Sequence, residues 1–292
     1  MQAKRKLNIV YWAFPSWNGD YMKSTVELAK ELAVKHRVLY IDYAYTLKDV
    51  LTAKSKPFMP VKRITGQAES LQEVKLENGG TIYVLSLPPI IPFNWAGNKT
   101  IYEILEGLNS TIVAGRVKRA LKKIDFDTDV VVNAFNPFFG KATKKVFAGK
   151  PVLYYCYDNI DAAAWAAKHG ARLEKDFMCS VDGVIFSSDA LLENKASRAP
   201  KFVVKNGVDL RAFGEIKPTT SPGKNKVIGY TGTVDDRLDF ELLENMIKAK
   251  PGFEFRFIGR VITPKAEALK KYSNVKFYGP VEPPTLPAMM KD

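Results

Sequence analysis

Carboxylate and amide side chains follow two predicted buried strands, the position at which parallel sheets bind their ligands. Asp158 comes directly after one apolar run, and Asn133 and Asn136 stand at the end of the preceding run. Ligands of open parallel sheets bind outside the carboxyl ends of the strands. We therefore expect Asp158 to orient a substrate hydroxyl or to stabilise positive charge at a reacting carbon. Asp158 could instead cap the next helix, although Asp161 is closer to that helix.

The loop after a later strand combines glycine with a basic residue. Gly232 and Thr233 follow the apolar run Val227–Tyr230, and Arg237 comes just before a predicted helix. Backbone amides at a helix start bind phosphate groups, and a guanidinium can bind two phosphate oxygens at once. This loop therefore predicts a diphosphate site. Arg260 follows the next strand and could add a second positive charge, or it could be an ordinary surface arginine.

Several familiar cofactor and metal signatures are missing from the sequence. It has no G-x-G-x-x-G fingerprint after a strand and no G-x-x-x-x-G-K-[ST] loop, which argues against a dinucleotide-binding enzyme and a P-loop NTPase. His36 and His169 are far apart, and we expect both on solvated surface. Asp125, Asp127 and Asp129 are spaced like the start of a calcium loop, but the glycine that such a loop needs is missing. We expect no metal and no cofactor.

The composition indicates a folded, basic protein. The 292 residues include 44 basic and 31 acidic side chains, a net charge of +13, and 46% are hydrophobic. This length suffices for two α/β domains. The two cysteines form no disulfide framework, which favours a reducing cytosol. We expect neither a signal peptide nor a membrane-spanning segment. Three basic clusters in the first half predict an electropositive face for anionic partners.

Strands and helices alternate along the chain, which predicts parallel sheets covered by helices. A strand at Leu7–Tyr11, a loop that contains Gly19 and Asp20, and a helix with a capping box beginning at Ser24 form the first βαβ unit. We expect Gly19 and Asp20 to face the same sheet edge as the candidates above. Residues 71–87 alternate around an Asn-Gly-Gly turn, which predicts a hairpin at an edge of the sheet.

The stretch from Lys201 to Asp236 has the pattern of a joint between two domains. It contains Asn206-Gly207-Val208-Asp209, then Phe213, a passage rich in Pro, Gly, Ser and Lys, and a strand ending at Gly232. This stretch resembles the interdomain joint of GT-B glycosyltransferases, in particular the family-4-like branch that makes bacterial surface polysaccharides of the teichuronic acid type. The resemblance covers essentially the whole chain.

The resemblance implies an α/β protein with two Rossmann-like, doubly wound parallel-sheet domains, the second of them incomplete. The expected division is residues 1–208 for the acceptor-side domain, 209–225 for a linker, and 226–292 for the first half of the nucleotide-sugar domain.

The resemblance also gives roles to the candidate residues. Acceptor-side residues would be Gly19, Asp20, Asn133 and Asn136; the catalytic residue would be Asp158; and donor-binding residues would be Gly232, Thr233, Arg237 and Arg260. The family has basic residues directly after the donor-loop glycine and four positions later. Here Thr233 occupies the first position and Arg237 the second. The pair of glutamates that the family carries further on has no counterpart before Asp292. We therefore expect a fragment with little transferase activity of its own.

The implied function is transfer of a hexose from a nucleotide diphosphate-sugar to a saccharide or lipid-linked acceptor, with retention and without a metal, in polysaccharide biosynthesis for the cell envelope. We expect a cytoplasmic enzyme that docks peripherally on the inner face of the membrane through its basic first domain, with Phe93 and Trp95 as interfacial anchors. One alternative is a nucleotide-sugar epimerase of the same architecture. Another is a non-catalytic protein that binds a polyanion or a membrane surface. Nucleic acid is not an expected partner.

Overall fold

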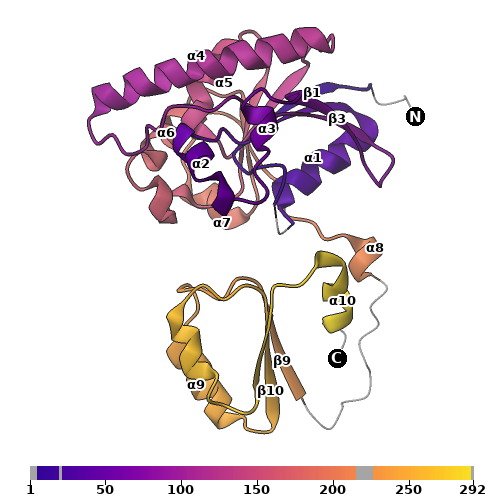
Figure 1. Cartoon of the computed structure of the whole chain (residues 1–292), viewed down its shortest axis with the longest axis vertical. Helices are drawn as coiled ribbons and strands as arrows, with labels where there is room; N and C mark the ends of the chain where they lie inside the picture. Colours follow the sequence, from indigo (N-terminus) through magenta and orange to yellow (C-terminus); the bar gives the residue numbers. More distant parts are fainter. Residues whose placement is uncertain (1–4, 20–21, 215–225, 291–292) are drawn as a thin grey trace. The chain divides into compact units, whose positions relative to one another are not determined.

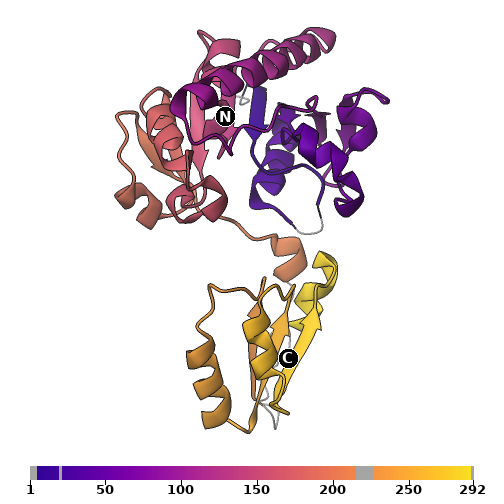
Figure 2. The same cartoon turned by 60° about the vertical axis from the view of Figure 1, so that its left-hand side comes forward.

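The structure is a computed structural model that describes residues 5–19, 22–214 and 226–290. The chain divides into two compact units between Asn206 and Gly207. Each unit has its own sheet and its own helices (Figure 1), and a view turned by 60° shows the strands of each sheet from another side (Figure 2).

The first unit contains an eight-stranded sheet in the order β3-β4-β2-β1-β5-β6-β7-β8. Its strands are β1 (Asn8–Ala13), β2 (Arg37–Ile41), β3 (Leu71–Lys75), β4 (Thr81–Leu85), β5 (Val130–Ala134), β6 (Val152–Cys156), β7 (Gly183–Phe186) and β8 (Lys201–Val203). All neighbouring strands are parallel except β3 and β4, which form the predicted hairpin at the sheet edge. On one side of β1 lie β2, β4 and, at the edge, β3, and on the other side the chain runs from β5 outward to β8. The strand order therefore reverses between β1 and β5.

Helices cover both faces of this sheet. They are α1 (Ser24–Lys35), α2 (Leu47–Leu51), α3 (Val61–Ile64), α4 (Lys99–Lys123), α5 (Gly140–Val146), α6 (Gly170–Met178) and α7 (Asp189–Asn194). Successive side chains of a strand point to opposite faces. Val10 and Trp12 accordingly lie in a core with α4, α5 and α6, whereas Ile9, Tyr11 and Ala13 lie in a core with α1. This confirms the doubly wound first domain.

Two helix starts differ from the expectation. Ser24 is the first residue of α1, Lys23 is its N-cap, and no side chain caps the helix, so the predicted capping box is wrong. A capping box occurs instead at α2, where Thr46 accepts the amide of Asp49 and the Asp49 side chain accepts the amide of Thr46.

The helix expected from about Ala162 is shorter in the structure. Two 3₁₀ turns, η3 (Ile160–Ala162) and η4 (Ala164–Ala166), precede α6. Asp161 therefore does not cap a helix. Its amide is bound by the Asn159 side chain at 3.3 Å, and its carboxylate pairs with Lys195 at 2.6 Å.

The second unit has a three-stranded parallel sheet in the order β11-β10-β9. Its elements are α8 (Leu210–Phe213), β9 (Lys226–Thr231), α9 (Phe240–Ala249), β10 (Phe253–Ile258), η5 (Pro264–Leu269), β11 (Val275–Gly279), η6 (Pro283–Thr285) and α10 (Leu286–Met289). Ile247 of α9 and Leu269 of η5 pack on Phe255 and Phe257 of the central strand. Most of the expected linker, residues 215–225, lies outside the described part of the chain.

Candidate functional site

A pocket opens at the carboxyl ends of the central strands of the first unit, where the strand order reverses. Phe14 directly follows β1, Tyr43 comes two residues after β2, and Asn136 comes two residues after β5. The pocket has a volume of about 230 Å³, and roughly 150 Å³ suffices for a benzene ring. It is lined by Phe14, Tyr43, Ala44, Thr46, Lys48, Ile90, Pro92, Phe93, Asn94, Trp95, Asn136, Phe138 and Phe139. We call it the ring-sized pocket.

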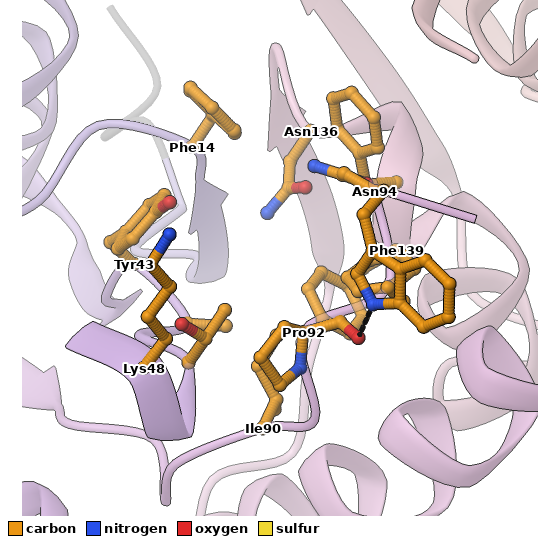
Figure 3. A pocket seen from close by; sticks show the side chains of 13 residues that line it. Phe14, Tyr43, Lys48, Ile90, Pro92, Asn94, Asn136 and Phe139 are labelled. Atoms are coloured by element: carbon orange, nitrogen blue, oxygen red, sulfur yellow. Dashed lines mark hydrogen bonds between the residues drawn. The ribbon is translucent and has the colours of Figure 1, made fainter. Parts of the chain in front are cut away.

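Asn136 supplies an unused hydrogen-bond acceptor to this pocket. Its side chain is 3% exposed, and its Nδ2 donates to the carbonyl oxygen of Ala13 at 3.4 Å. Its Oδ1 has no hydrogen-bond partner among the described residues. Figure 3 shows the amide directed into the space that Phe14, Tyr43 and Pro92 surround. Buried polar atoms without a partner are rare. Oδ1 itself is shielded from solvent, so a bound hydroxyl or amine would reach it only after a small movement of the Asn136 side chain.

The backbone before Asn136 is held in an unusual conformation. Phe135 has φ +56°, a left-handed value that bulky side chains seldom adopt. Such residues cost about 1–3 kcal/mol and are concentrated at functional sites. The amide of Phe135 donates to the carbonyl oxygen of Tyr155 at 2.9 Å, and its ring packs on Tyr157 with centroids 4.6 Å apart. These contacts hold the turn that directs Asn136 toward the pocket.

Aromatic rings form much of the surrounding wall. Phe14 stacks on Trp165 with centroids 4.7 Å apart, meets Tyr43 edge-on at 5.5 Å, and contacts Phe138 at 6.0 Å. Trp165 is half exposed. Flat, partly exposed rings offer dispersion contacts to the apolar face of a ligand ring.

Two further cavities adjoin the ring-sized pocket. One, of about 370 Å³, shares Phe14 and Tyr43 with it and is also lined by Gly19 and Lys23. The other, of about 160 Å³, shares Asn94 and Phe138 with it. The three cavities together form a groove along the carboxyl ends of the strands.

A buried carboxylate organises the loops at one end of this groove. Asp42 follows β2 and is 2% exposed, and its Oδ1 accepts the amides of Trp17 at 2.7 Å and Tyr43 at 2.8 Å. Burial raises the pKa of Asp42 to about 6, although these two hydrogen bonds and the positive charge of Lys23 oppose the shift. Lys23 binds the carbonyl oxygens of Ser16 and Asn18, each at 2.6 Å. Asp42 and Lys23 thus fix the first loop beside the groove.

The predicted acceptor-side residues fall at different depths. Gly19 is exposed and lines the cavity of about 370 Å³, whereas Asp20 lies outside the described residues. Asn136 lines the ring-sized pocket. Asn133 is fully buried, and its amide binds the backbone of Asn136 and the hydroxyl of Thr143. Asn133 thus lies behind the pocket wall.

The predicted catalytic residue is at the correct sheet edge but beside the groove. Asp158 comes two residues after the end of β6 and is exposed. Its Oδ1 accepts the amide of Asn159 at 2.8 Å. Asp158 is not among the residues that line the three cavities.

Two side chains expected at the surface are buried. His169 is 7% exposed, its Nε2 lies 2.8 Å from the carbonyl oxygen of Ala96, and its ring packs on Tyr102 with centroids 3.9 Å apart. The expectation of a solvated His169 is therefore wrong. Phe93 is 4% exposed because it packs on Tyr102 and Phe139, so it cannot be an interfacial anchor. Trp95, the other expected anchor, is 63% exposed.

The donor-loop candidates lie in the second unit, where glycine permits close backbone contact. Gly232 (φ +147°) and Gly259 (φ +144°) follow β9 and β10, and a Cβ on Gly259 would lie 2.0 Å from the carbonyl oxygen of Gly232. The amide of Val234 donates to the carbonyl oxygen of Arg260 at 2.8 Å, and the carbonyl oxygen of Thr233 accepts the hydroxyl of Tyr230.

Two charged residues after this loop form an ion pair with each other. Arg237 binds Asp235 through Nε and Nη2 at 3.0 and 2.8 Å, and these hydrogen bonds lower the pKa of Asp235. Helix α9 begins at Phe240, two residues later than expected, and the Asp239 side chain accepts the amide of Leu242 at 2.9 Å. A carboxylate of the chain itself therefore occupies the helix start that was expected to bind a diphosphate.

The described ranges contain neither a metal-binding cluster nor a membrane-spanning helix. Residues 5–19, 22–214 and 226–290 contain no group of three or more His, Cys, Asp or Glu side chains placed to hold a metal ion. In the same ranges, no helix combines the length and apolar character that crossing a bilayer requires.

Sequence reasoning missed the aromatic walls and the isolated Oδ1. One signal for the aromatic wall was present in the sequence, because Phe14, Tyr43 and Phe138 each come shortly after a predicted strand. That signal identifies a site only when the strand order is known, because residues at the carboxyl ends of parallel strands become neighbours only when the strands are adjacent.

Comparison with known proteins identifies the fold. No family model and no curated protein matches the chain. Among solved structures, it is similar to a UDP-forming α,α-trehalose-phosphate synthase from Burkholderia xenovorans, with TM-score 0.58, 11% identity, and coverage of 98% of this chain and 76% of that one. The catalytic domain of starch synthase IV from Arabidopsis thaliana, bound to ADP and acarbose, gives TM-score 0.58, 9% identity, and coverage of 97% and 76%.

A variant of S. aureus TarM, in complex with fondaparinux, α-GlcNAc-glycerol and UDP, gives TM-score 0.51, 11% identity, and coverage of 98% and 80%. These structural neighbours are GT-B glycosyltransferases. The chain therefore has the GT-B fold, as the sequence predicted.

Proposed function

We propose that the chain belongs to a glycosyltransferase and that its first unit binds the sugar acceptor in the ring-sized pocket. The observation that carries this proposal is a pocket large enough for one six-membered ring, lined by Asn136, whose buried Oδ1 has no hydrogen-bond partner among the described residues. An acceptor hydroxyl would donate to Oδ1, and the rings of Phe14 and Phe138 would contact the apolar face of the sugar. The GT-B fold and the saccharides in the neighbouring structures support this assignment.

We assign the donor to the second unit. Thr233 would present its backbone amide to the diphosphate of a nucleotide sugar, and Arg237 and Arg260 would supply positive charge. Gly232, whose own amide donates to the carbonyl oxygen of Ile258 at 2.9 Å, would let the diphosphate approach the backbone closely. Arg237, whose side chain is 81% exposed, would exchange its contact with the partly buried Asp235 for the diphosphate. The UDP and ADP named with the neighbouring structures support a nucleoside diphosphate here.

The reaction we propose breaks the bond between the anomeric carbon and the diphosphate oxygen and forms a bond to the acceptor oxygen. Asp158 would orient the acceptor hydroxyl or stabilise positive charge on the sugar, and amides and arginine would stabilise the leaving diphosphate without a metal. The proposal also includes retention at the anomeric carbon, a role in cell-envelope polysaccharide synthesis and a cytoplasmic location. A nucleotide-sugar epimerase would need no acceptor, whereas the saccharides named with the neighbouring structures favour transfer to one.

A donor and acceptor screen tests the proposal. UDP-, ADP- and GDP-sugars would be tested first for thermal stabilisation of the protein, and then for release of nucleoside diphosphate with and without simple glycosides or lipid-linked sugars. We expect one donor class to stabilise the protein and its turnover to depend on an acceptor. Proton NMR of the product reports the anomeric configuration, and EDTA tests the metal requirement. Conversion of a nucleotide sugar into its epimer without an acceptor, or no stabilisation by any donor, would contradict the proposal.

A further inference from the structure

Three large apolar side chains point to solvent from a short segment beside the groove. Residues 47–63 form α2, a 3₁₀ turn and the start of α3. In this segment Leu51 is 87% exposed, Leu47 is 50% exposed and Phe58 is 46% exposed. We call residues 47–63 the docking segment.

The folding of this segment does not require those three side chains. A small core beneath it contains Tyr45, Met59 and Ile64, with Val50 and Val61 packed against it. The capping box at Thr46 closes the start of α2. The inward side chains therefore hold the segment in place, and the exposed apolar groups remain available to a partner.

The docking segment is also strongly basic. It contains five basic residues and one acidic residue, a net charge of +4. Asp49, the acidic residue, accepts hydrogen bonds from Thr46 and is paired with Lys56, so its charge is compensated within the segment. Lys48, Lys54 and Lys62 are exposed. Apolar and cationic side chains thus share one short surface stretch.

This stretch borders the openings of the groove. Lys48 lines the ring-sized pocket, and Lys56 and Phe58 line the cavity of about 370 Å³. Trp95, which is 63% exposed, also lines the ring-sized pocket. Figure 3 shows Lys48 on one side of that pocket and Asn94 on the other. A surface that bound the docking segment would therefore lie next to the entrance of the acceptor site.

We propose that the docking segment binds an anionic lipid bilayer, with Leu47, Leu51 and Phe58 in the headgroup–acyl boundary and the lysines among anionic headgroups. Leucine and phenylalanine combined with lysine are typical of interfacial segments, and basic side chains are attracted to anionic leaflets. A second copy of the chain is a poorer partner, because symmetric contact would bring two segments of charge +4 together. This inference rests on the proposed function only for its purpose, which is to bring a lipid-linked acceptor to the groove.

Vesicle co-sedimentation tests the proposal. The probes are vesicles of phosphatidylcholine with phosphatidylglycerol, compared with vesicles of phosphatidylcholine alone, each at low and high salt. The test variant is L47E/L51E, which charges two exposed leucines four positions apart on α2. The matched control is I104E/L108E, which charges two exposed side chains, 59% and 51% accessible, at the same spacing on α4. K54E/K62E tests the electrostatic part, and circular dichroism and thermal unfolding verify that each variant folds.

We expect the wild-type protein to sediment with the anionic vesicles and to lose affinity as salt is added. L47E/L51E should weaken binding at least tenfold, and K54E/K62E should weaken it and reduce its salt dependence, because each lysine contributes roughly fivefold to partitioning. I104E/L108E should bind like the wild type. No binding to anionic vesicles, or loss of binding in the α4 control alone, would overturn the proposal. L47E/L51E should transfer sugar to a water-soluble acceptor as well as the wild type does. If the wild-type protein bound vesicles but transferred no sugar, the proposed function would be contradicted and the membrane proposal would stand.

Discussion

Asn133 holds Asn136 through a reciprocal pair of hydrogen bonds. The Oδ1 of Asn133 accepts the backbone amide of Asn136 at 2.9 Å, and its Nδ2 donates to the backbone carbonyl of Asn136 at 3.1 Å. The same Nδ2 donates to Thr143 at 3.0 Å. Two asparagines that look alike in the sequence therefore have different positions. The side chain of Asn133 is satisfied by the protein behind the wall, whereas Asn136 lines the pocket and its buried Oδ1 has no partner among the described residues.

This difference predicts opposite effects for two alanine variants. N133A should lower the free energy of unfolding by about 1–3 kcal/mol, because it leaves the buried amide of Asn136 without its partner. The carbonyl oxygen of Asn136 keeps the amide of Phe139 at 3.3 Å. N136A should lower the free energy of unfolding by less than about 1 kcal/mol, because the one hydrogen bond that the Asn136 side chain makes to the described residues is long, at 3.4 Å. N136A should instead weaken acceptor binding about tenfold by removing the acceptor atom. Urea unfolding and the dependence of turnover on acceptor concentration measure the two effects. Equal acceptor affinity in N136A and the wild type would refute the role of Oδ1.

The buried Asp42 predicts a pH dependence of stability. Its pKa is raised from its ordinary value to about 6, so the folded protein keeps the proton while the unfolded chain loses it. Stability should therefore fall as the pH rises from about 4 to about 6 and be constant above that range, with a total loss on the order of 3 kcal/mol.

D42N isolates this contribution. An asparagine can still accept the amides of Trp17 and Tyr43, but it never has to be ionised inside the protein. D42N should be more stable than the wild type at pH 8 and nearly equal to it at pH 4, as measured by urea unfolding at both values. If the difference in stability between D42N and the wild type were the same at both pH values, ionisation of Asp42 would not be the cause of the pH dependence.

The strands were predictable because their signal is local. The run Val130–Ala134 and the hairpin at residues 71–87 are apolar or alternating over several consecutive residues, and burial in a covered sheet follows from that pattern. The parallel arrangement followed from the intervening helices. The resemblance of the joint before Gly232 supplied the GT-B fold.

The site was less predictable because its parts are distant in the sequence. Phe14 and Trp165 stack at 4.7 Å although about 150 positions separate them, and nothing in either local pattern identifies the other. His169 is buried because the carbonyl of Ala96, 73 positions away, lies 2.8 Å from its ring nitrogen. Its own neighbours in the sequence indicated an exposed helix. Tertiary contacts of this kind override local propensity.

The close contact between Gly259 and Gly232 predicts a strong effect of one methyl group. G259A would place Cβ 2.0 Å from the carbonyl oxygen of Gly232 and would force alanine into a backbone conformation with φ +144°. The second unit should lose at least about 2 kcal/mol of stability. G252A is the control, because a Cβ there meets nothing within 4 Å. Hydrogen exchange of the β9 and β10 amides separates this loss from the first unit. Equal protection in the two variants would contradict the prediction.

A buried ion pair beside the η3 turn predicts that removal of one charge strongly lowers the stability of the protein. The Nζ of Lys195 lies 2.7 Å from Glu174 and 2.6 Å from Asp161, and Glu174, which is 2% exposed, also accepts the hydroxyl of Tyr154 at 2.7 Å. K195M would leave the Glu174 carboxylate buried without a cation. Breaking such a pair on one side costs about 3 kcal/mol or more, so we expect a loss of this size in the free energy of unfolding.

Two further variants separate the effect of the lysine charge on stability from the effect of lysine side-chain packing. K205M removes a lysine whose pair with Asp189 is exposed on both sides, and it should change stability by less than about 1 kcal/mol. K195M/E174Q removes both charges of the buried pair and keeps an acceptor for Tyr154. This double variant should recover at least half of the stability lost in K195M, because the uncompensated charge is gone. If K195M/E174Q were as unstable as K195M, packing of the lysine side chain would explain the loss, and the buried ion pair would not.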